Sequence, residues 1–361
     1  MLNFKAGASR PAGDGACPNH LEAANDLVRQ TLSRHGLWSE TDGPVTPLAD
    51  LMKGLNLPSA WQDTPRPSAP PSTLPEGAVF RAETYSGPTG SRTYRHYVPA
   101  SASDGAIGIV LMLHGCTQTP EDFAIGTKMN ALAEAHRLVL IYPAQARGAN
   151  AQTCWNWFSK GDQRRDCGEP AILAGITRTA MAEHGVAAER VFVAGLSAGA
   201  AMAVILGEAY PDIFAAVGAH SGLPFGAASD VPSAFAAMAG DLQGVAAAPA
   251  TGTRRAIVFH GAADRTVHPS NGVEIARRAG NSLGAQAIQT IETGKQHGRS
   301  FRRILASDSD GTVLSEHWVI DGLGHAWSGG NGAGSYADPA GPDASAEMIR
   351  FFLDLPAGGT R

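Results

Sequence analysis

Short apolar segments, each closed by a turn rich in glycine or proline, constrain the fold of this 361-residue chain more than any other feature. The clearest are IGIVLML (107–113), LVLIYP (138–143), RVFVAG (190–195), FAAVGAH (214–220) and RAIVFHG (255–261), with SEHWVI (315–320) as the last. Continuous apolar runs of this length are typical of strands that are buried on both faces of a parallel sheet. We therefore expect a sheet with helices on both sides.

Helix-like stretches lie between these strands, as such a sheet requires. They are DFAIGTKMNALAEAHR (122–137), EPAILAGITRTAMAEHG (169–185) and SAGAAMAVILGEAYP (197–211), the last of which ends at a proline. Before the first buried strand, AVFRAETY and SRTYRHYVP flank SGPTG and predict a β-hairpin. The pattern predicts an α/β fold with a doubly wound, mostly parallel sheet and an N-terminal hairpin.

The chain divides into three regions by composition. Residues 1–57 form an extension in which HLEAANDLVRQTLSRH (20–35) predicts a short amphipathic helix. Residues 58–75 contain six prolines and predict an extended linker. The compact domain is expected to span residues 76–361.

Composition excludes several functional classes. With 17% charged residues and a formal net charge of −5, the chain lacks the basic balance of a nucleic-acid-binding protein. No apolar run approaches eighteen residues, so no membrane span is expected, and the N-terminus lacks the apolar core of a secretory signal. Without such a signal, the protein is expected to be either cytoplasmic or a mature form from which the signal has been removed. Four cysteines without paired C-x-x-C spacing do not indicate a metal site.

The segment VFVAGLSAGAAMA (191–203) places Ser197 between two glycines, where a predicted strand meets a predicted helix. Glycines at 195 and 199 would let the two backbones approach closely and raise the serine at the end of the strand, as in a nucleophile elbow. The N-terminus of the following helix favours negative charge nearby. The alternative is a packing turn without chemistry, and the strand-to-helix context favours the nucleophile.

A serine nucleophile needs a histidine base and an acid that orients it. His325 lies in the glycine-flanked loop DGLGHAWSGG after the last predicted strand, which makes it the best base. Asp264 follows the strand AIVFH in a loop at the same edge of the sheet and is the preferred acid, with Asp321 second. His260 and His317 sit within strands, where a hydrogen-bonded structural role is expected.

Acyl transfer also requires N–H donors for the oxyanion of the tetrahedral intermediate. The backbone N–H of Ala198, directly after the serine, is expected to be one donor. The N–H of Cys116 in HGCTQ is expected to be the other, because this loop follows the strand LMLHG at the same edge. This chemistry requires no cofactor and no metal.

Several motifs together resemble the esterase family of extracellular short-chain polyhydroxyalkanoate depolymerases, type 1 catalytic domain. They are HGCTQTPEDFA, LIYPAQ, CWNWF, GEPAIL, VFVAGLSAGAAMA with YPDIFAAVGAHSGLPFG, and GLGHAWSGG, and the resemblance covers roughly residues 85–355. It implies an α/β-hydrolase fold, the triad Ser197, Asp264 and His325, and a secreted enzyme. It also implies a serine esterase that hydrolyses poly(3-hydroxybutyrate) or related oligoesters.

The resemblance leaves the acyl group open, because relatives with this catalytic domain include feruloyl and acetylxylan esterases. A peptidase of the same fold and a binding protein on an inactive hydrolase scaffold are the more distant alternatives. The partner is thus expected to be a polyester or a small ester. The sequence does not indicate an oligomeric state.

Two sets of side chains near the expected site have alternative roles. Trp155, Trp157 and Trp327 are expected either to line the substrate cleft or to be buried in the core. The resemblance also places Cys116 and Cys154 near the site, where a disulfide between them would brace the oxyanion loop. A bridge between Cys154 and Cys167 is the other pairing, and the sequence does not choose between them.

Overall fold

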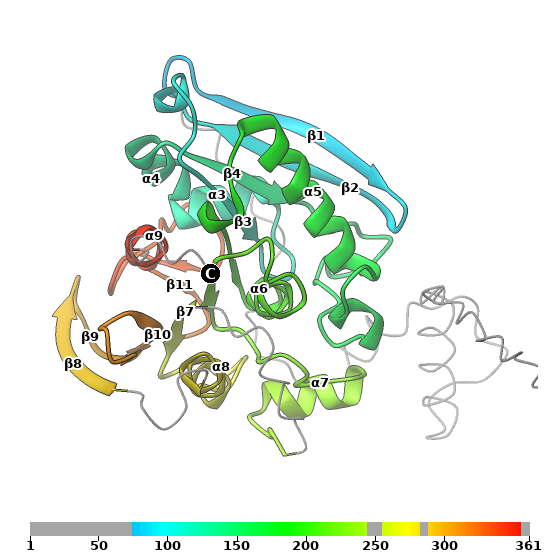
Figure 1. The fold of residues 1–361 in the computed structure, drawn as a ribbon. Coiled ribbons are helices and arrows are strands. Elements are labelled where there is room, and N and C mark those ends of the chain that lie inside the picture. Colours follow the sequence, from blue (N-terminus) through cyan, green and yellow to red (C-terminus); the bar gives the residue numbers. More distant parts are fainter. Residues whose placement is uncertain (1–73, 244–254, 282–287, 355–361) are drawn as a thin grey trace, which may run out of the picture.

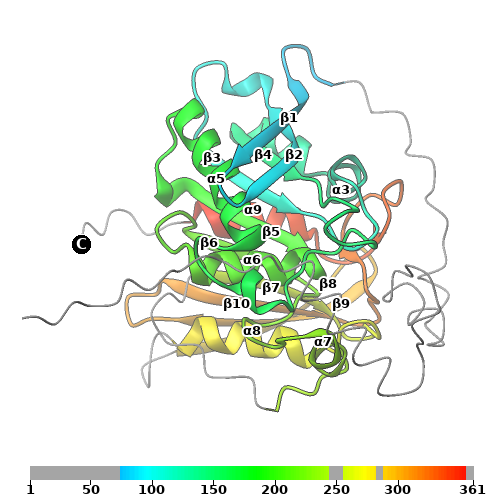
Figure 2. The same ribbon diagram turned by 90° about the vertical axis from the view of Figure 1, so that its right-hand side faces the viewer.

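The computed structural model describes residues 74–243, 255–281 and 288–354. Its ten-stranded sheet has the order β1-β2-β4-β3-β5-β6-β7-β10-β9-β8, with β1 and β2 at one edge and β8 and β9 at the other (Figures 1 and 2). The strands are β1 (Val79–Gly87), β2 (Gly90–Val98), β3 (Gly108–Leu113), β4 (Leu138–Pro143), β5 (Val191–Leu196), β6 (Ala216–His220), β7 (Arg255–Gly261), β8 (Ile288–Gln296), β9 (Arg299–Ser307) and β10 (Val313–Ile320), and the short strands β11 (Trp327–Ser328) and β12 (Ala337–Asp338) pair separately.

The six central strands, β4, β3, β5, β6, β7 and β10, are all parallel. Every residue of β3 to β7 is buried, which explains why these strands read as continuous apolar runs. The predicted doubly wound, mostly parallel α/β sheet is confirmed, as is the N-terminal hairpin, in which β1 and β2 pair antiparallel.

Helices cover both faces of the sheet (Figure 1). Apolar residues of α5, α6, α7 and α8 form one core layer, and those of α3, α4 and α9 form the other. Alternate residues of each strand contribute to the two layers; for example, Leu111 faces the first and Val110 the second. The helices are α3 (Pro120–Thr127), α4 (Met129–His136), α5 (Gly168–His184), α6 (Ala198–Ala209), α7 (Val231–Met238), α8 (Ser270–Asn281) and α9 (Ala344–Leu353), with the 3-10 helices η2 (Ala100–Ala102), η3 (Lys160–Gln163) and η4 (Ala188–Arg190).

The structure differs from the expected elements in three places. The stretch predicted as one helix over 122–137 is two helices, α3 and α4, because Lys128 adopts a left-handed conformation with φ 55°. The pair β8 and β9 was not predicted, since β8 is largely exposed and lacks a buried apolar run. The helices α7 and α8 were also not predicted.

The helix expected over 20–35 and nearly all of the proline-rich stretch 58–75 lie outside the described residues. The sheet begins at Val79. Among the described helices, none combines the length and the apolar character that crossing a membrane requires.

Candidate active site

Ser197 lies in a sharp turn between β5 and α6. Its backbone has φ 58° and ψ −120°, a conformation that a non-glycine residue adopts only under strain. A Cβ at Gly199 would lie 2.1 Å from the carbonyl oxygen of Leu113, and one at Gly195 would lie 2.4 Å from the carbonyl carbon of Gly199. Both glycines are therefore required for the close approach of strand and helix, which is the geometry of a nucleophile elbow.

His325 and Asp264 meet on loops that follow β10 and β7. His325 Nδ1 lies 2.8 Å from Asp264 Oδ2, and the backbone N–H groups of Thr266 and Val267 each donate to Asp264 Oδ1 at 2.9 Å. Burial alone would raise the pKa of Asp264, but the hydrogen bond and charge of His325 outweigh it and lower this pKa to about 2. The ionised carboxylate accepts a hydrogen bond from Nδ1–H, so Nε2 of His325 carries the lone pair.

The nucleophile candidate is not hydrogen-bonded to the base in this structure. Ser197 Oγ makes no hydrogen bond with His325 among the described residues. Ser197 follows β5 and His325 lies in the loop after β10. Both strands end at the same edge of the parallel sheet, with β6 and β7 between them. In unliganded hydrolases such contacts often close only when substrate binds.

The other histidines and the second candidate acid have different surroundings. His260 is buried and its Nε2 donates to the carbonyl oxygen of Val267 at 2.9 Å, which fits the expected structural role. His317 is also buried, but its Nε2 atom has no hydrogen-bond partner. The expectation that its ring is hydrogen-bonded is therefore wrong for Nε2. Burial lowers the pKa of His317 to about 3 and keeps the ring neutral. Asp321 is exposed, and His325 pairs with Asp264 instead.

The N–H groups of Cys116, in the loop after β3, and of Ala198, at the start of α6, are the candidate oxyanion donors. The N–H of Gly115 donates to Gln118 Oε1 at 2.8 Å, and the N–H of Thr117 donates to the carbonyl oxygen of Gln152 at 2.8 Å. The N–H groups of Cys116 and Ala198 donate no hydrogen bond to any described residue. Both remain available for a ligand beside Ser197.

A disulfide fixes this loop to the segment that carries CWNWF. Cys116 and Cys154 are bonded, with a Cα–Cα distance of 4.2 Å. The alternative pairing of Cys154 with Cys167 does not occur, and Cys167 belongs to another disulfide. The bridge restrains the backbone whose N–H at 116 is a candidate donor.

Of the three tryptophans considered for the substrate cleft, only one borders a cavity. Trp157 lines the cavity next to Ser197. Trp155 and Trp327 are wrong as cleft residues, because both are fully buried and their indole N–H groups are satisfied inside the core. Trp155 donates to the carbonyl oxygen of His114 at 3.0 Å, and Trp327 donates to Ser345 Oγ at 3.0 Å.

The cavity beside Ser197 has a volume of about 240 Å³ and mostly apolar walls. Helix α7 contributes four of its side chains, which are Val231, Ala234, Phe235 and Met238. Arg265 is the only charged side chain among the described residues that line it. A concave, largely apolar site with few polar groups is typical of a small-molecule pocket.

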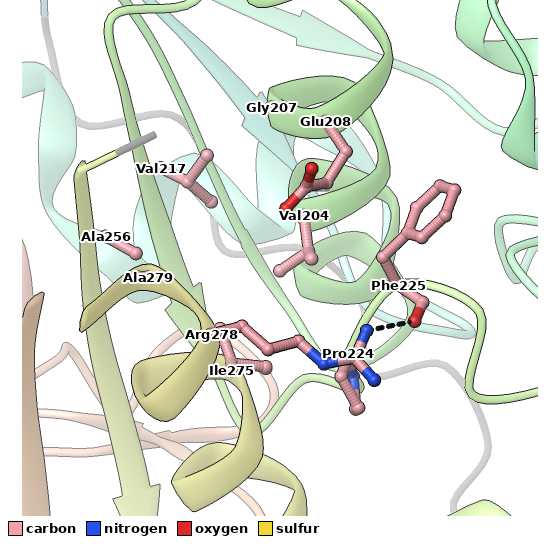
Figure 3. Close-up of a pocket in the computed structure, with 10 residues that line it drawn as sticks. All are labelled: Val204, Gly207, Glu208, Val217, Pro224, Phe225, Ala256, Ile275, Arg278 and Ala279. Carbon is pink, nitrogen blue, oxygen red and sulfur yellow. Dashed lines mark hydrogen bonds between the residues drawn. The ribbon is translucent and has the colours of Figure 1, made fainter. Parts of the chain in front are cut away.

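A second cavity, between α6 and α8, is much smaller. Figure 3 shows its lining residues, among them Val204 of α6 and Ile275 of α8, with the Arg278 guanidinium donating to the carbonyl oxygen of Phe225 at 2.8 Å. Its volume of about 30 Å³ has room for a few water molecules at most. It is therefore too small for an acyl group. The cavity beside Ser197 is the candidate substrate site because Ser197 itself lines it.

A buried polar network joins the loop after β3 to the segments around Gln145, Asn156 and Glu169. No role was predicted for these three residues from the sequence. Glu169, in the first turn of α5, accepts from the backbone N–H of Asn156 at 2.8 Å and from its side-chain amide at 2.9 Å. Gln145 donates through Nε2 to Glu169 and to the carbonyl oxygen of Cys154, while its backbone N–H donates to His114 Nε2 at 3.1 Å. These residues lie in the motifs LIYPAQ, CWNWF and GEPAIL, which the network joins in space.

Comparisons with known proteins identify the family of the chain. The model of the family described as Esterase PHB depolymerase, where PHB is poly(3-hydroxybutyrate), matches residues 92–283, more than half of the chain. The chain belongs to this family. The fold is that of the α/β-hydrolases, and the relatives that match the chain are named as depolymerases and esterases.

Individual relatives include both polyester and plant-polymer esterases. Poly(3-hydroxyalkanoate) depolymerase C of Paucimonas lemoignei is 33% identical over 60% of this chain and 54% of its own length. Feruloyl esterase B of Neurospora crassa is 28% identical over 66% of this chain and 85% of its own length. The chain spans little more than half the length of the depolymerases it matches.

Among solved structures, an acetyl xylan esterase from Aspergillus awamori superimposes with a TM-score of 0.58 at 19% identity. The match covers 76% of this chain and 99% of that esterase. At this identity the likeness concerns the fold alone.

Proposed function

We propose that this chain is a serine esterase that hydrolyses hydroxyalkanoate oligoesters, such as those of 3-hydroxybutyrate, through an acyl-enzyme. The observation that supports this most is the position of Ser197. It lies in a strained turn and lines an apolar cavity. Asp264 and His325 form a hydrogen bond at the same edge of the sheet. Asp264 holds His325 as the tautomer whose Nε2 accepts a proton, which is the requirement for activating a serine.

The reaction follows from these positions in two steps. Nε2 of His325 takes the proton of Ser197 Oγ as the oxygen attacks the ester carbonyl, and the N–H groups of Cys116 and Ala198 donate to the oxyanion. The intermediate collapses to the acyl-enzyme when His325 returns the proton to the leaving alkoxide. Water then attacks the acyl-enzyme, with His325 again as base, and releases the hydroxy acid and free Ser197.

The decisive experiment replaces the nucleophile. Ser197→Ala should lower kcat for p-nitrophenyl butyrate and for a hydroxybutyrate trimer by about a millionfold, because the three groups act as a unit. Ser101→Ala, at an exposed serine on η2, is the matched control and should be fully active. Unchanged turnover by Ser197→Ala, or failure of the wild type to react with a fluorophosphonate probe, would remove the proposal and favour an inactive scaffold.

A second candidate is a feruloyl or acetylxylan esterase, which keeps the same triad. Its support is the match to feruloyl esterase B, which covers 85% of that protein's length compared with 54% for the depolymerase of P. lemoignei. Comparing kcat/KM for a hydroxybutyrate trimer, methyl ferulate and acetylated xylo-oligosaccharides distinguishes the candidates. A preference for either plant substrate would replace the oligoester assignment.

We also propose that the protein works outside the cytoplasm. Disulfides such as Cys116–Cys154 persist mainly in oxidising compartments, and this one braces the candidate oxyanion loop. Fractionation of the producing cells, followed by detection of the protein in the medium or periplasm, tests this proposal. Recovery from the cytoplasm alone, with reduced cysteines, would contradict it.

A further inference from the structure

Two histidines and a glutamate converge at the end of the molecule opposite the candidate active site. His96 lies on β2, and Glu183 and His184 are the last two residues of α5. One ligand atom from each residue lies within 4.8 Å of the other two. Nε2 of His96 and Nε2 of His184 are only 2.9 Å apart, and their rings are nearly perpendicular.

The orientation of His96 leaves a lone pair facing His184. His96 is buried, and its Nδ1 lies 3.1 Å from Glu83 Oε1. Glu83 also accepts hydrogen bonds from the hydroxyl of Tyr94 and from Nε of Arg81, so its carboxylate is placed to accept a hydrogen bond from Nδ1–H of His96. A carboxylate that holds the outer nitrogen of a histidine is a common support for a metal ligand, because it fixes the tautomer and the direction of the lone pair.

The charge balance also suits a cation. Glu83 and Glu183 contribute two negative charges, and Arg81, which pairs with both, contributes one positive charge. Arg81 Nη2 lies 3.3 Å from His96 Nδ1 and donates to Glu183 Oε1 at 2.6 Å, so Glu183 would have to leave Arg81 to bind an ion.

We propose that His96, His184 and Glu183 form a binding site for a divalent transition ion of the Zn²⁺ type, which clamps β2 to the end of α5. Two imidazole nitrogens and one carboxylate oxygen are a typical protein donor set for Zn²⁺, with water in the fourth position. At a Zn–N distance of about 2.0–2.1 Å, two nitrogens on one tetrahedral ion are about 3.3 Å apart. The two rings would therefore separate by only a few tenths of an ångström, and the partly exposed Glu183 would turn inward.

The proposed ion would stabilise the fold and take no part in ester hydrolysis. Glu169 and His184 lie at opposite ends of the seventeen-residue helix α5, a separation of about 20–25 Å along the helix axis. The buried network behind the oxyanion loop includes Glu169, so the ion would bind far from the reacting atoms. Its effects should appear in thermal stability and in metal affinity.

The test measures Zn²⁺ binding to the full, chelator-treated chain by calorimetry, together with Tm in the presence and absence of Zn²⁺. We expect the wild type to bind one ion tightly and to melt at a higher temperature with Zn²⁺. His184→Gln should lower the affinity at least tenfold and abolish the Tm increase, and Glu83→Gln should lower the affinity about tenfold to hundredfold. Co²⁺ in place of Zn²⁺ should give the visible absorption bands of a tetrahedral site.

Two controls keep the outcome interpretable. His136→Gln, at an exposed histidine at the end of α4, should bind Zn²⁺ like the wild type. His184→Gln retains His325, so any adventitious binding at the candidate active site persists in it, and metal-free esterase activity should be unchanged. No Zn²⁺ binding by the wild type, or equal binding by His184→Gln, would overturn the proposal.

Discussion

Two buried carboxylates, Asp264 in the loop after β7 and Glu169 at the start of α5, have opposite protonation behaviour. Each is only 5% exposed. The pKa of Asp264 is lowered to about 2, whereas that of Glu169 is raised to about 7 by burial and by the neighbouring Asp162 carboxylate. Equal burial therefore does not decide the charge of a carboxyl group, and its partners do.

The partners differ in kind. Asp264 receives two backbone N–H groups on one oxygen and His325 on the other, and a second histidine, His260, lies 3.5 Å away. The nearest cation to Glu169 is Arg92, at 3.7 Å, and the second carboxylate beside it opposes ionisation. Asp264 is thus held as an anion beside the candidate base His325, whereas the pKa of Glu169 is raised into the neutral range.

Among the tests of this comparison between Asp264 and Glu169, the largest expected effect comes from removing the charge of Asp264. Asp264→Asn should lower kcat for p-nitrophenyl butyrate by about ten-thousandfold, because an amide does not hold His325 in the tautomer that accepts the serine proton. The measurement is steady-state kinetics, with circular dichroism to verify the fold.

Asp321→Asn is the matched control, because Asp321 is the other acid near His325 in the sequence and is exposed. It should retain nearly full activity. If Asp321→Asn lowered kcat as much as Asp264→Asn, Asp264 would not be the carboxylate that orients His325.

The next largest effect concerns the cation beside Glu169. Arg92→Met leaves Glu169 and Asp162 without their nearest positive charge and should lower the free energy of unfolding by about 3–5 kcal/mol. Glu169 binds a proton more tightly in the folded than in the unfolded state, so stability should fall as the pH rises from about 4.5 to about 7. Without Arg92 its pKa should rise further, and the variant should be more destabilised at pH 8 than at pH 5. Chemical denaturation at both pH values measures this.

Arg147→Gln provides the comparison for Arg92→Met, since Arg147 is exposed in the loop after β4. It should change stability by less than about 0.5 kcal/mol at either pH. A destabilisation by Arg92→Met that is the same at pH 5 and pH 8 would show that Glu169 does not titrate in this range.

The sequence predicted the centre of the molecule better than its edges. Segments such as LVLIYP form parallel strands that are buried on both faces, so a continuous apolar run in the sequence predicts them. The antiparallel pair β8 and β9 has a weaker sequence pattern, because β8 faces solvent along most of its length. Both residues of its turn, His297 and Gly298, have positive φ angles, and the glycine at 298 is the sequence feature that indicates a turn there.

The same contrast holds for the candidate site. Ser197, Asp264 and His325 each follow a predicted strand, so their common edge was deducible from topology. The positions of the Trp155 and Trp327 rings could not be deduced from the sequence. A tryptophan beside such a motif gives the same sequence pattern whether its ring faces a cavity or the core. The pairs Gln145–Glu169 and His96–His184 join residues 24 and 88 positions apart through side chains alone, and no local spacing indicates them.

The smallest effect should come from Arg265, the arginine that follows Asp264 in the sequence. Unlike Arg92 it is exposed, and it lines the cavity as its only charged residue among those described. Arg265→Gln should therefore leave stability within about 0.5 kcal/mol of the wild type. It should raise KM for hydroxybutyrate oligomers with a free carboxylate about twofold to fivefold, the size of one exposed ion pair. The methyl ester of the same oligomer carries no charge for the guanidinium to attract, so its KM should be unchanged. If KM rises equally for both substrates, Arg265 shapes the cavity wall and does not recognise a carboxylate. Arg92 and Arg265 would then differ only in how deeply they are buried.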